Sequence, residues 1–407
     1  MTLLSAARRV WRSALPEPVR KLASPLLNAA LETYVRAAAR APHGAEAPFG
    51  PLKVVGYFQG SHGIAASARL AARAFEALGV PVERVDVTDA KLDWDGRLIA
   101  PVSASAWIFH LNPPELLAAL ACLGPKQLLG PRYGYWAYEL PRAPARWRRD
   151  AALVDEVWAP SRYTADALAG AAAPVRVVPH PLVLEDYAKV QPAPRGRAFQ
   201  GVGVFDFNSS LARKNPRGAI AAWARAFGGD PDCELTLKTQ NGGAFPDALA
   251  ALRSATPANV RVIDEVWPYA QVQGLIAGAD VLVSLHRAEG FGLTPAEAMA
   301  MGVPVLATAW SGVLDFMDET CAAMVPFTLT PVVDPQGVYR GQSWAEPDVN
   351  AAAQALVRLR GDPGLRRRLG EAGRARVAER LSPQAWFATL PPAVKTAAMA
   401  AIRDAKT

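Results

Sequence analysis

Short apolar runs alternate with helix-forming segments along the first half of the chain. Residues 53–58 read as a buried strand, and a glycine- and serine-rich turn and an alanine-rich helix over about 65–78 follow them. The same pattern then recurs, with helices predicted over 114–123 and 163–168 and strands over 81–87, 105–110, 126–129, 154–159 and 175–178. Short apolar strands that alternate with helices predict a parallel sheet with helices on both faces.

The second half repeats this alternation after a proline- and glycine-rich stretch over 191–197, which has the composition of a linker. Strands are predicted over 199–205, 234–238, 260–263, 280–284 and 303–307, with helices between them and helical segments from 349 onward. The fold class is therefore predicted to be α/β, with two doubly wound Rossmann-like domains over 51–190 and 191–385 that face a central cleft. An N-terminal helical extension, 1–50, and a C-terminal helix, 386–407, which is expected to pack back on the first domain, complete this division.

The composition agrees with this division and narrows the class of protein. A chain of 407 residues exceeds one ordinary core. No apolar run approaches the roughly 20 residues that cross a bilayer, and no signal-peptide pattern is present, so we expect a cytoplasmic protein. Three scattered cysteines form neither a C-x-x-C pair nor a disulfide framework. The net charge of +7 comes from dispersed basic residues, so nucleic acid is not an expected partner.

Residues 1–50 combine basic and apolar positions and leave two interpretations open. Leucine, valine and tryptophan alternate here with five basic residues, Arg8, Arg9, Arg12, Arg20 and Lys21. A basic amphipathic segment of this kind either lies in a membrane interface or packs on the neighbouring domain. The first interpretation predicts a peripheral protein at the inner face of the membrane, and the second predicts a structural extension.

One glycine-rich segment of the second half carries the most specific signal. Gly290 and Gly292 bracket Phe291, so the backbone there turns tightly and a ligand can approach it closely. Thr294 is predicted to cap a helix, and Glu297 completes a capping box three residues later. A strand, a glycine turn and a helix start together present free backbone N–H groups and the positive end of the helix dipole. This environment suits a diphosphate.

The segment from Glu289 to Glu297, EGFGLTPAE, resembles the E-x7-E motif of the retaining GT-B glycosyltransferases of family GT4. The resemblance extends over about 52–390. In that family the first glutamate contacts hydroxyls of the transferred sugar and the second binds the nucleotide ribose. The resemblance therefore implies a catalytic role for Glu289 and a substrate-binding role for Glu297. The backbone N–H groups implied to hold the diphosphate are those of Phe291, Gly292 and Leu293.

A second segment, 205–216, resembles the family's strand-to-helix loop, in which an arginine and a lysine neutralise the donor phosphates. Lys214 matches the lysine, and the resemblance implies a catalytic role for it. Asn208 or Ser209 stands where the arginine usually does. Arg213 is the candidate to replace that arginine in substrate binding, and the alternative is a solvated side chain that points away.

The first domain offers three further candidates. Gly60 and Gly63 occupy the place of the family's glycine-rich loop, which faces the donor phosphate and the acceptor. His110, at the end of a predicted strand, matches a histidine near the transferred sugar, so the resemblance implies a catalytic role; a structural histidine is the alternative.

An aromatic cluster in the first domain has two interpretations. It consists of Tyr133, Tyr135, Trp136 and Tyr138, with Glu139 beside them. Such rings stack well on sugars and isoprenoid lipids, which favours an acceptor site. A buried core explains the same cluster equally well.

The resemblance implies a retaining glycosyltransferase that moves a hexose from a nucleotide-diphosphate sugar onto a glycan or lipid-linked acceptor. GDP-mannose and UDP-sugars are the first donors to test, and bacterial surface polysaccharide synthesis is the expected context. No cofactor and no metal are expected, because the D-x-D-like sequence Asp93-Trp94-Asp95 lacks a further acidic ligand. Two alternatives remain: a non-catalytic nucleotide-sugar- or glycan-binding subunit of a polysaccharide assembly complex, and a GT-B sugar-nucleotide epimerase.

Overall fold

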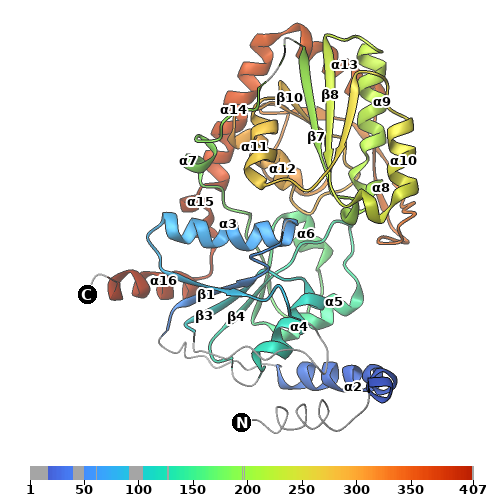
Figure 1. The fold of residues 1–407 in the computed structure, drawn as a ribbon. Coiled ribbons are helices and arrows are strands. Elements are labelled where there is room, and N and C mark those ends of the chain that lie inside the picture. Colours follow the sequence, from blue (N-terminus) through green and yellow to red (C-terminus); the bar gives the residue numbers. More distant parts are fainter. Residues whose placement is uncertain are drawn as a thin grey trace.

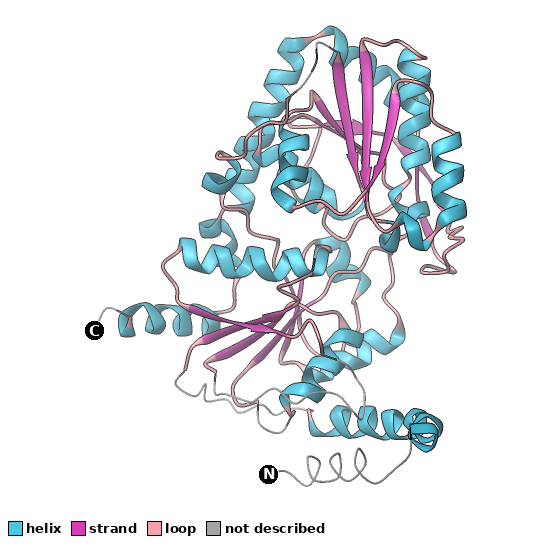
Figure 2. Cartoon of the chain, viewed as in Figure 1, coloured by secondary structure: helices cyan, strands magenta, loops and turns pink. Residues whose placement is uncertain are grey.

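Two parallel sheets of six strands each dominate the part of the chain that the computed structural model describes. These residues are 17–39, 50–60, 62–90, 104–125, 128–194, 196 and 198–405. Each sheet is the centre of its own domain, and the two domains lie one above the other along the long axis of the molecule (Figures 1 and 2). Helices cover both faces of each sheet. The fold class is therefore α/β with two Rossmann-like domains, as predicted.

The first sheet has the strand order β2-β1-β3-β4-β5-β6, and its paired strands run parallel. Strands β1, β3 and β4 are buried along their whole length, because helices cover both faces. The strands are β1 (Leu52–Gly56), β2 (Val82–Asp86), β3 (Ala106–Phe109), β4 (Arg132–Tyr135), β5 (Glu156–Ala159) and β6 (Val175–Val177). The helices are α2 (Glu17–Ala38), α3 (Gly63–Ala77), α4 (Pro113–Leu123), α5 (Ala145–Asp150), η1 (Ala151–Leu153) and α6 (Arg162–Ala167). The next helix, α7 (Leu184–Tyr187), packs on the core of the second domain.

The second sheet has the strand order β12-β11-β10-β7-β8-β9 and is also parallel. Its strands are β7 (Phe199–Val204), β8 (Cys233–Thr239), β9 (Val260–Asp264), β10 (Val281–Ser284), β11 (Val305–Thr308) and β12 (Ala323–Val325). Its helices are η2 (Phe207–Ser209), α8 (Leu211–Lys214), α9 (Pro216–Phe227), η3 (Gly242–Ala244), α10 (Pro246–Ser254), α11 (Tyr269–Ala277), α12 (Leu293–Ala300), η4 (Ser311–Asp315), α13 (Val349–Gly361) and α14 (Pro363–Leu381). An antiparallel hairpin, β13 (Phe327–Pro331) and β14 (Ser343–Pro347), follows β12.

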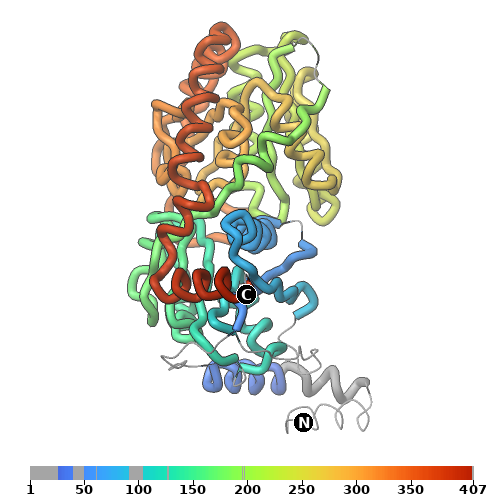
Figure 3. Tube along the Cα trace, turned by 90° about the vertical axis from the view of Figure 1, so that its left-hand side faces the viewer, coloured from blue at the N-terminus to red at the C-terminus, as the bar shows by residue number. Residues whose placement is uncertain are grey.

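The C-terminal helices lead back from the second domain to the first. Helix α14 runs beside the second sheet, and α15 (Pro383–Thr389) and α16 (Pro392–Asp404) continue to the first domain (Figure 3). Trp386 packs edge-on against Phe75 of α3, with ring centroids 4.8 Å apart. Val394 of α16 belongs to the same buried cluster as the β1 side chains. The second half of the chain thus completes the core of the first domain.

The fourth strand lies elsewhere than predicted. Residues 128 and 129 are irregular, 126 and 127 lie outside the described residues, and β4 begins at Arg132. The first residue of this strand is a buried arginine. Its guanidinium donates to three carbonyl oxygens, those of Ala39, Pro125 and Leu128, at 3.2, 3.0 and 3.0 Å. These bonds compensate the burial of the charge, and they link α2 to the sheet. The β13–β14 hairpin was not predicted either.

Candidate active site

The E-x7-E segment joins β10 to α12. Helix α12 begins at Leu293, and Gly292 is its N-cap with φ +95°, a left-handed conformation that favours glycine. The predicted capping box is wrong, because Thr294 and Glu297 both lie inside the helix and the N-cap makes no side-chain hydrogen bond. The first backbone N–H groups of α12 therefore have no capping side chain, which leaves them available to an anion.

Gly290 connects this turn to the first domain. Ser161 Oγ and Thr164 Oγ1, at the start of α6, donate to the carbonyl oxygen of Gly290 at 2.5 and 3.2 Å. A Cβ atom at Gly290 would lie 3.1 Å from the carbonyl oxygen of Tyr138. A side chain at this position would therefore crowd the first-domain backbone, and the motif turn lies directly at the domain interface.

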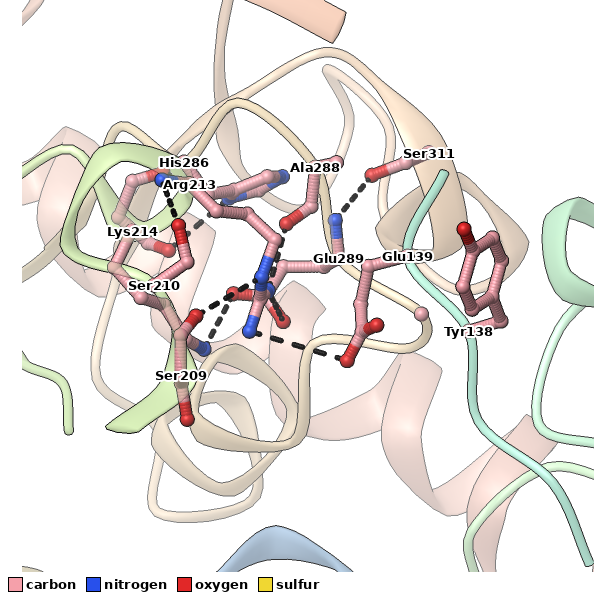
Figure 4. Close-up of polar contacts among 12 residues, drawn as sticks. Tyr138, Glu139, Ser209, Ser210, Arg213, Lys214, His286, Ala288, Glu289 and Ser311 are labelled. Atoms are coloured by element: carbon pink, nitrogen blue, oxygen red, sulfur yellow. Dashed lines mark hydrogen bonds and ion pairs between the residues drawn. The ribbon is translucent and has the colours of Figure 1, made fainter. Parts of the chain in front are cut away.

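Lys214 and Arg213 converge on Glu289, as Figure 4 shows. Lys214 Nζ donates to Glu289 Oε1 at 2.6 Å, and Arg213 Nη1 lies 3.2 Å from Glu289 Oε2. The backbone N–H of Glu289 donates to Ser311 Oγ at 2.8 Å. The two basic residues of the 205–216 segment and the first glutamate of the motif therefore form one cluster.

The charge state of Glu289 follows from this cluster. Burial by itself would raise the pKa of the carboxyl group, but Lys214 and Arg213 outweigh that effect and lower the pKa to about 2. The group is ionised at neutral pH. A buried carboxylate of this kind accepts strong hydrogen bonds, which suits the hydroxyls of a sugar.

The guanidinium of Arg213 is engaged on several sides. Its Nε donates to the Ser209 carbonyl oxygen at 3.2 Å, and its Nη1 donates to the Ala288 carbonyl oxygen at 2.9 Å. Its Cζ lies 5.9 Å from the ring centroid of Tyr339. The side chain is 3% exposed, so it points into the protein and not into solvent. The predicted role of Arg213 in phosphate binding stays a prediction.

Two residues that the motifs did not point to complete the cluster. Glu139, from the loop after β4, lies 3.9 Å from Arg213 Nη2, and Tyr339, from the loop of the hairpin, donates to Glu139 Oε2 at 2.8 Å. Glu139 was visible in the sequence only as a neighbour of the aromatic cluster. Tyr339 lies 200 residues away along the chain, and no local pattern could have indicated the pair.

Glu297, on α12, is buried, and two tyrosines share its carboxyl group. Tyr187 of α7 donates to its Oε1 at 3.0 Å, and the hydroxyl of Tyr269, the first residue of α11, donates to the same oxygen. Burial raises the pKa of Glu297 to about 7, although the two hydroxyls and Arg69 act in the opposite direction. The predicted ribose-binding residue thus carries a carboxyl group that titrates near neutral pH.

This titration predicts a pH dependence of stability. The pKa of Glu297 is raised in the folded state, from its ordinary value of 4.5 to about 7. Its contribution to stability is therefore fully present below pH 4.5 and is lost as the pH rises through 7. We expect the melting temperature of the wild type to fall relative to Glu297→Gln over this window. Parallel melting curves of the two proteins from pH 4.5 to 8 would contradict the assignment.

His110 lies at the end of β3 with its ring stacked on Tyr135, 4.6 Å between centroids. Ser67 Oγ lies 2.6 Å from its Nδ1, whereas its Nε2 has no hydrogen-bond partner among the described residues. Burial lowers the pKa of His110 to about 3, with a smaller contribution from His180. The imidazole is therefore neutral near pH 7, and the predicted catalytic role of His110 stays a prediction.

The glycine-rich turn after β1 contains the other two predicted binding residues. A Cβ atom at Gly60 would lie 2.9 Å from His62 Nε2. Gly63 is the first residue of α3, and nothing lies within 4 Å of the corresponding position there. The space around Gly63 therefore does not require glycine, and the binding roles of both residues stay predictions.

The aromatic cluster is mainly core. Tyr133, Tyr135 and Trp136 are buried in the two hydrophobic clusters of the first domain. Tyr138 is partly exposed and packs edge-on against Trp147, with 5.3 Å between ring centroids. The core interpretation therefore accounts for three of the four rings, because side chains enclosed on all sides cannot stack on an acceptor.

A family model described as "Family 4 Glycosyltransferase in conflict systems" matches residues 162–390, which is more than half of the chain. The chain belongs to this glycosyltransferase family. The matched region of this chain includes Arg213, Lys214 and the whole E-x7-E segment, Glu289 to Glu297.

Two curated relatives match parts of this glycosyltransferase. The GDP-mannose-dependent monoacylated alpha-(1-6)-phosphatidylinositol monomannoside mannosyltransferase of Corynebacterium glutamicum is 28% identical over 178 residues, 42% of this chain and 41% of that protein. The human alpha-1,3/1,6-mannosyltransferase ALG2 is 32% identical over 98 residues, 24% of this chain and 19% of that protein. The aligned region thus spans less than half the length of either relative.

Solved structures show that the glycosyltransferase has the GT-B fold. Sucrose-phosphate synthase from Thermosynechococcus elongatus aligns with a TM-score of 0.60 and 17% identity, covering 88% of this chain and 100% of that chain. The Anabaena protein HepE, in complex with UDP and glucose, aligns with a TM-score of 0.59 and 14% identity, covering 83% and 97%. At such low identities the likeness concerns the fold alone.

Some predictions about the glycosyltransferase fall on residues outside the described ranges. These are Arg8, Arg9 and Arg12, the side chains of Arg20 and Lys21, and the sequence Asp93-Trp94-Asp95. Where the structure describes the chain, no group of three or more His, Cys, Asp or Glu side chains is arranged to hold a metal ion. In the same residues, no helix has both the length and the apolar character that crossing a bilayer requires.

Proposed function

We propose that this chain transfers a hexose from a nucleotide-diphosphate sugar to a glycan or lipid-linked acceptor with retention of the anomeric configuration. The observation that carries the proposal is the contact of Lys214 with Glu289 at 2.6 Å, beside the uncapped start of α12. This arrangement offers a cation and backbone N–H groups to a diphosphate, and a carboxylate to the sugar attached to it. GDP-mannose and UDP-sugars are the donors to test, because the Corynebacterium relative is a GDP-mannose-dependent mannosyltransferase and the similar HepE structure contains UDP and glucose.

The proposed reaction exchanges one bond at the anomeric carbon for another. The bond from that carbon to the diphosphate oxygen breaks, and a bond to the acceptor oxygen forms on the same face. Negative charge develops on the leaving diphosphate, where Lys214 and the N–H groups at 291–293 stabilise it. The leaving phosphate oxygen takes the proton of the acceptor hydroxyl. Glu289 holds the sugar through its hydroxyls. Because the protein's own donors stabilise the charge, we expect EDTA to leave turnover unchanged.

A nucleotide panel tests the proposal directly. A ligand that binds only the folded state stabilises it by about 2.7 kcal/mol at a hundred times its dissociation constant. We expect UDP or GDP to raise the melting temperature, and the matching donor to be consumed only when an acceptor extract is present. Consumption without an acceptor would indicate an epimerase or a hydrolase. Binding without consumption would indicate a non-catalytic subunit, and no binding by any nucleotide would refute the proposal.

The context of the reaction belongs to the same proposal. We place the enzyme in bacterial surface polysaccharide synthesis, at the inner face of the membrane, with the basic N-terminal segment as the contact. Fractionation of cells that produce the full chain, with a second chain that begins at Glu17 and so keeps α2 and its buried contacts, tests this placement. Equal recovery of both chains from membranes would contradict it.

A further inference from the structure

Helix α3 directs two arginines toward the second domain. The helix lies between the two sheets in Figure 1, and between the two domains in the turned view of Figure 3. Leu70 packs against the core cluster that contains the E-x7-E residues, and Arg73 forms a two-point ion pair with Asp186 of α7 at 2.8 and 2.9 Å. Arg69 stands four residues before Arg73, which places it one turn away on the same side of the helix.

The guanidinium of Arg69 lies between the elements that the proposed function assigns to the donor. Its Nη1 donates to the carbonyl oxygens of Gly60 and Phe58 at 2.7 and 3.2 Å, so it is held on the glycine turn of the first domain. Its positive charge also acts to lower the pKa of Glu297 in the second domain, against the larger and opposite effect of burial. Arg69 therefore lies where the glycine turn meets the predicted ribose-binding carboxyl group.

The second-domain loop over 205–214, which the resemblance assigns to the donor phosphates, offers few free cations. The loop over 205–214 contains no basic residue besides Arg213 and Lys214. Arg213 is buried and already bound to Ser209, Ala288 and Glu289. Lys214 keeps a partly exposed side chain, and so does Arg69. A nucleoside diphosphate carries more negative charge than one lysine neutralises, so a second accessible cation beside the backbone N–H groups would strengthen its binding.

We propose that Arg69 is this second cation and binds the diphosphate of the donor from the first domain, opposite Lys214. The inference rests on the proposed function. If Arg69 binds the diphosphate, the diphosphate contacts both domains, and the affinity for the nucleotide then depends on how the two domains are positioned. The anchoring bonds to Gly60 and Phe58 preorganise the guanidinium, which donates from its remaining N–H groups in a planar, two-point geometry that suits phosphate.

Calorimetric titration with UDP or GDP, whichever the panel selects, and with the matching nucleoside tests the inference. Arg69→Gln should weaken diphosphate binding at least tenfold and change nucleoside binding less than twofold. Arg73→Gln is the matched control, because it removes the same charge one turn along the same helix face. It should change both affinities less than twofold. Arg69→Lys, which keeps the charge but loses the planar donors, should weaken diphosphate binding to a smaller extent.

Each other result overturns the inference or the function beneath it. If Lys214→Ala weakens diphosphate binding and Arg69→Gln does not, Arg69 is not the second cation and the proposed function stands. Equal losses for nucleoside and diphosphate would show that Arg69 only holds the glycine turn. If the wild type binds neither nucleotide, the proposed function itself fails. Should Arg69→Gln not fold, Arg69→Lys decides, since unchanged diphosphate affinity in that variant contradicts two-point phosphate binding.

Discussion

Replacing Lys214 with alanine is expected to lower turnover at least a hundredfold while the protein stays folded. The ammonium group lies 2.6 Å from Glu289 Oε1 at the start of α12, where charge develops on the leaving diphosphate in the proposed reaction. Removing one preorganised donor of this kind typically costs about 3 kcal/mol of transition-state stabilisation, which corresponds to roughly a hundredfold. The measurement is kcat at saturating donor, with the melting temperature as the check on folding.

The matched control for this variant is Lys395→Ala. Lys395 lies on α16 of the C-terminal segment, where its Nζ donates to the carbonyl oxygen of Ala388. It removes the same charge far along the chain from the motif turn, and its turnover should stay within twofold of the wild type. A Lys214→Ala enzyme with turnover within threefold of the wild type would exclude Lys214 from the reaction centre.

The elements around the site were predictable because their signals are local. The apolar strand β10, the glycines at 290 and 292 and the start of α12 follow one another within the same stretch of sequence. Backbone preferences alone decide such a turn, since only glycine adopts the left-handed conformation at Gly292 without strain. The exact helix start was missed because a left-handed glycine terminated the turn earlier than the threonine would have.

The partners of the charged residues were not predictable, because they come from distant parts of the chain. Asn215, with φ +52°, separates α8 from α9, and the direction of the Arg213 side chain in so short a helix depends on tertiary contacts. Tyr339 reaches Glu139 across 200 residues. Tyr187 and Tyr269 meet at Glu297 from the segment before the second sheet and from α11. No periodicity connects such positions.

The same contacts change how the site is understood. Glu289 is a sugar-binding candidate, and it is also the main counter-charge of the buried Arg213, at 3.2 Å. One carboxylate therefore supports both the fold and the proposed chemistry. A single substitution confounds these two roles, and a pair of substitutions separates them.

Glu289→Gln is expected to reduce turnover at least a hundredfold and to destabilise the protein by about 3 kcal/mol. Leaving one partner of a buried ion pair uncompensated costs about 3 to 5 kcal/mol, and the nearby carboxylate of Glu139, 3.9 Å from Arg213, favours the low end of that range. The double variant Glu289→Gln with Arg213→Gln removes both charges. It should recover most of the stability and none of the turnover, which melting curves and kcat measure together.

The pH dependence of this stability gives the last test. The pKa of Glu289 is lowered in the folded state, from 4.5 to about 2, so its contribution is present above pH 4.5 and is lost as the pH falls toward 2. The difference in melting temperature between the wild type and Glu289→Gln should therefore shrink below pH 4.5. If the double variant regained turnover, Glu289 would only balance the charge of Arg213. If the melting difference persisted unchanged at pH 3, the ion pair would not be the source of the stability.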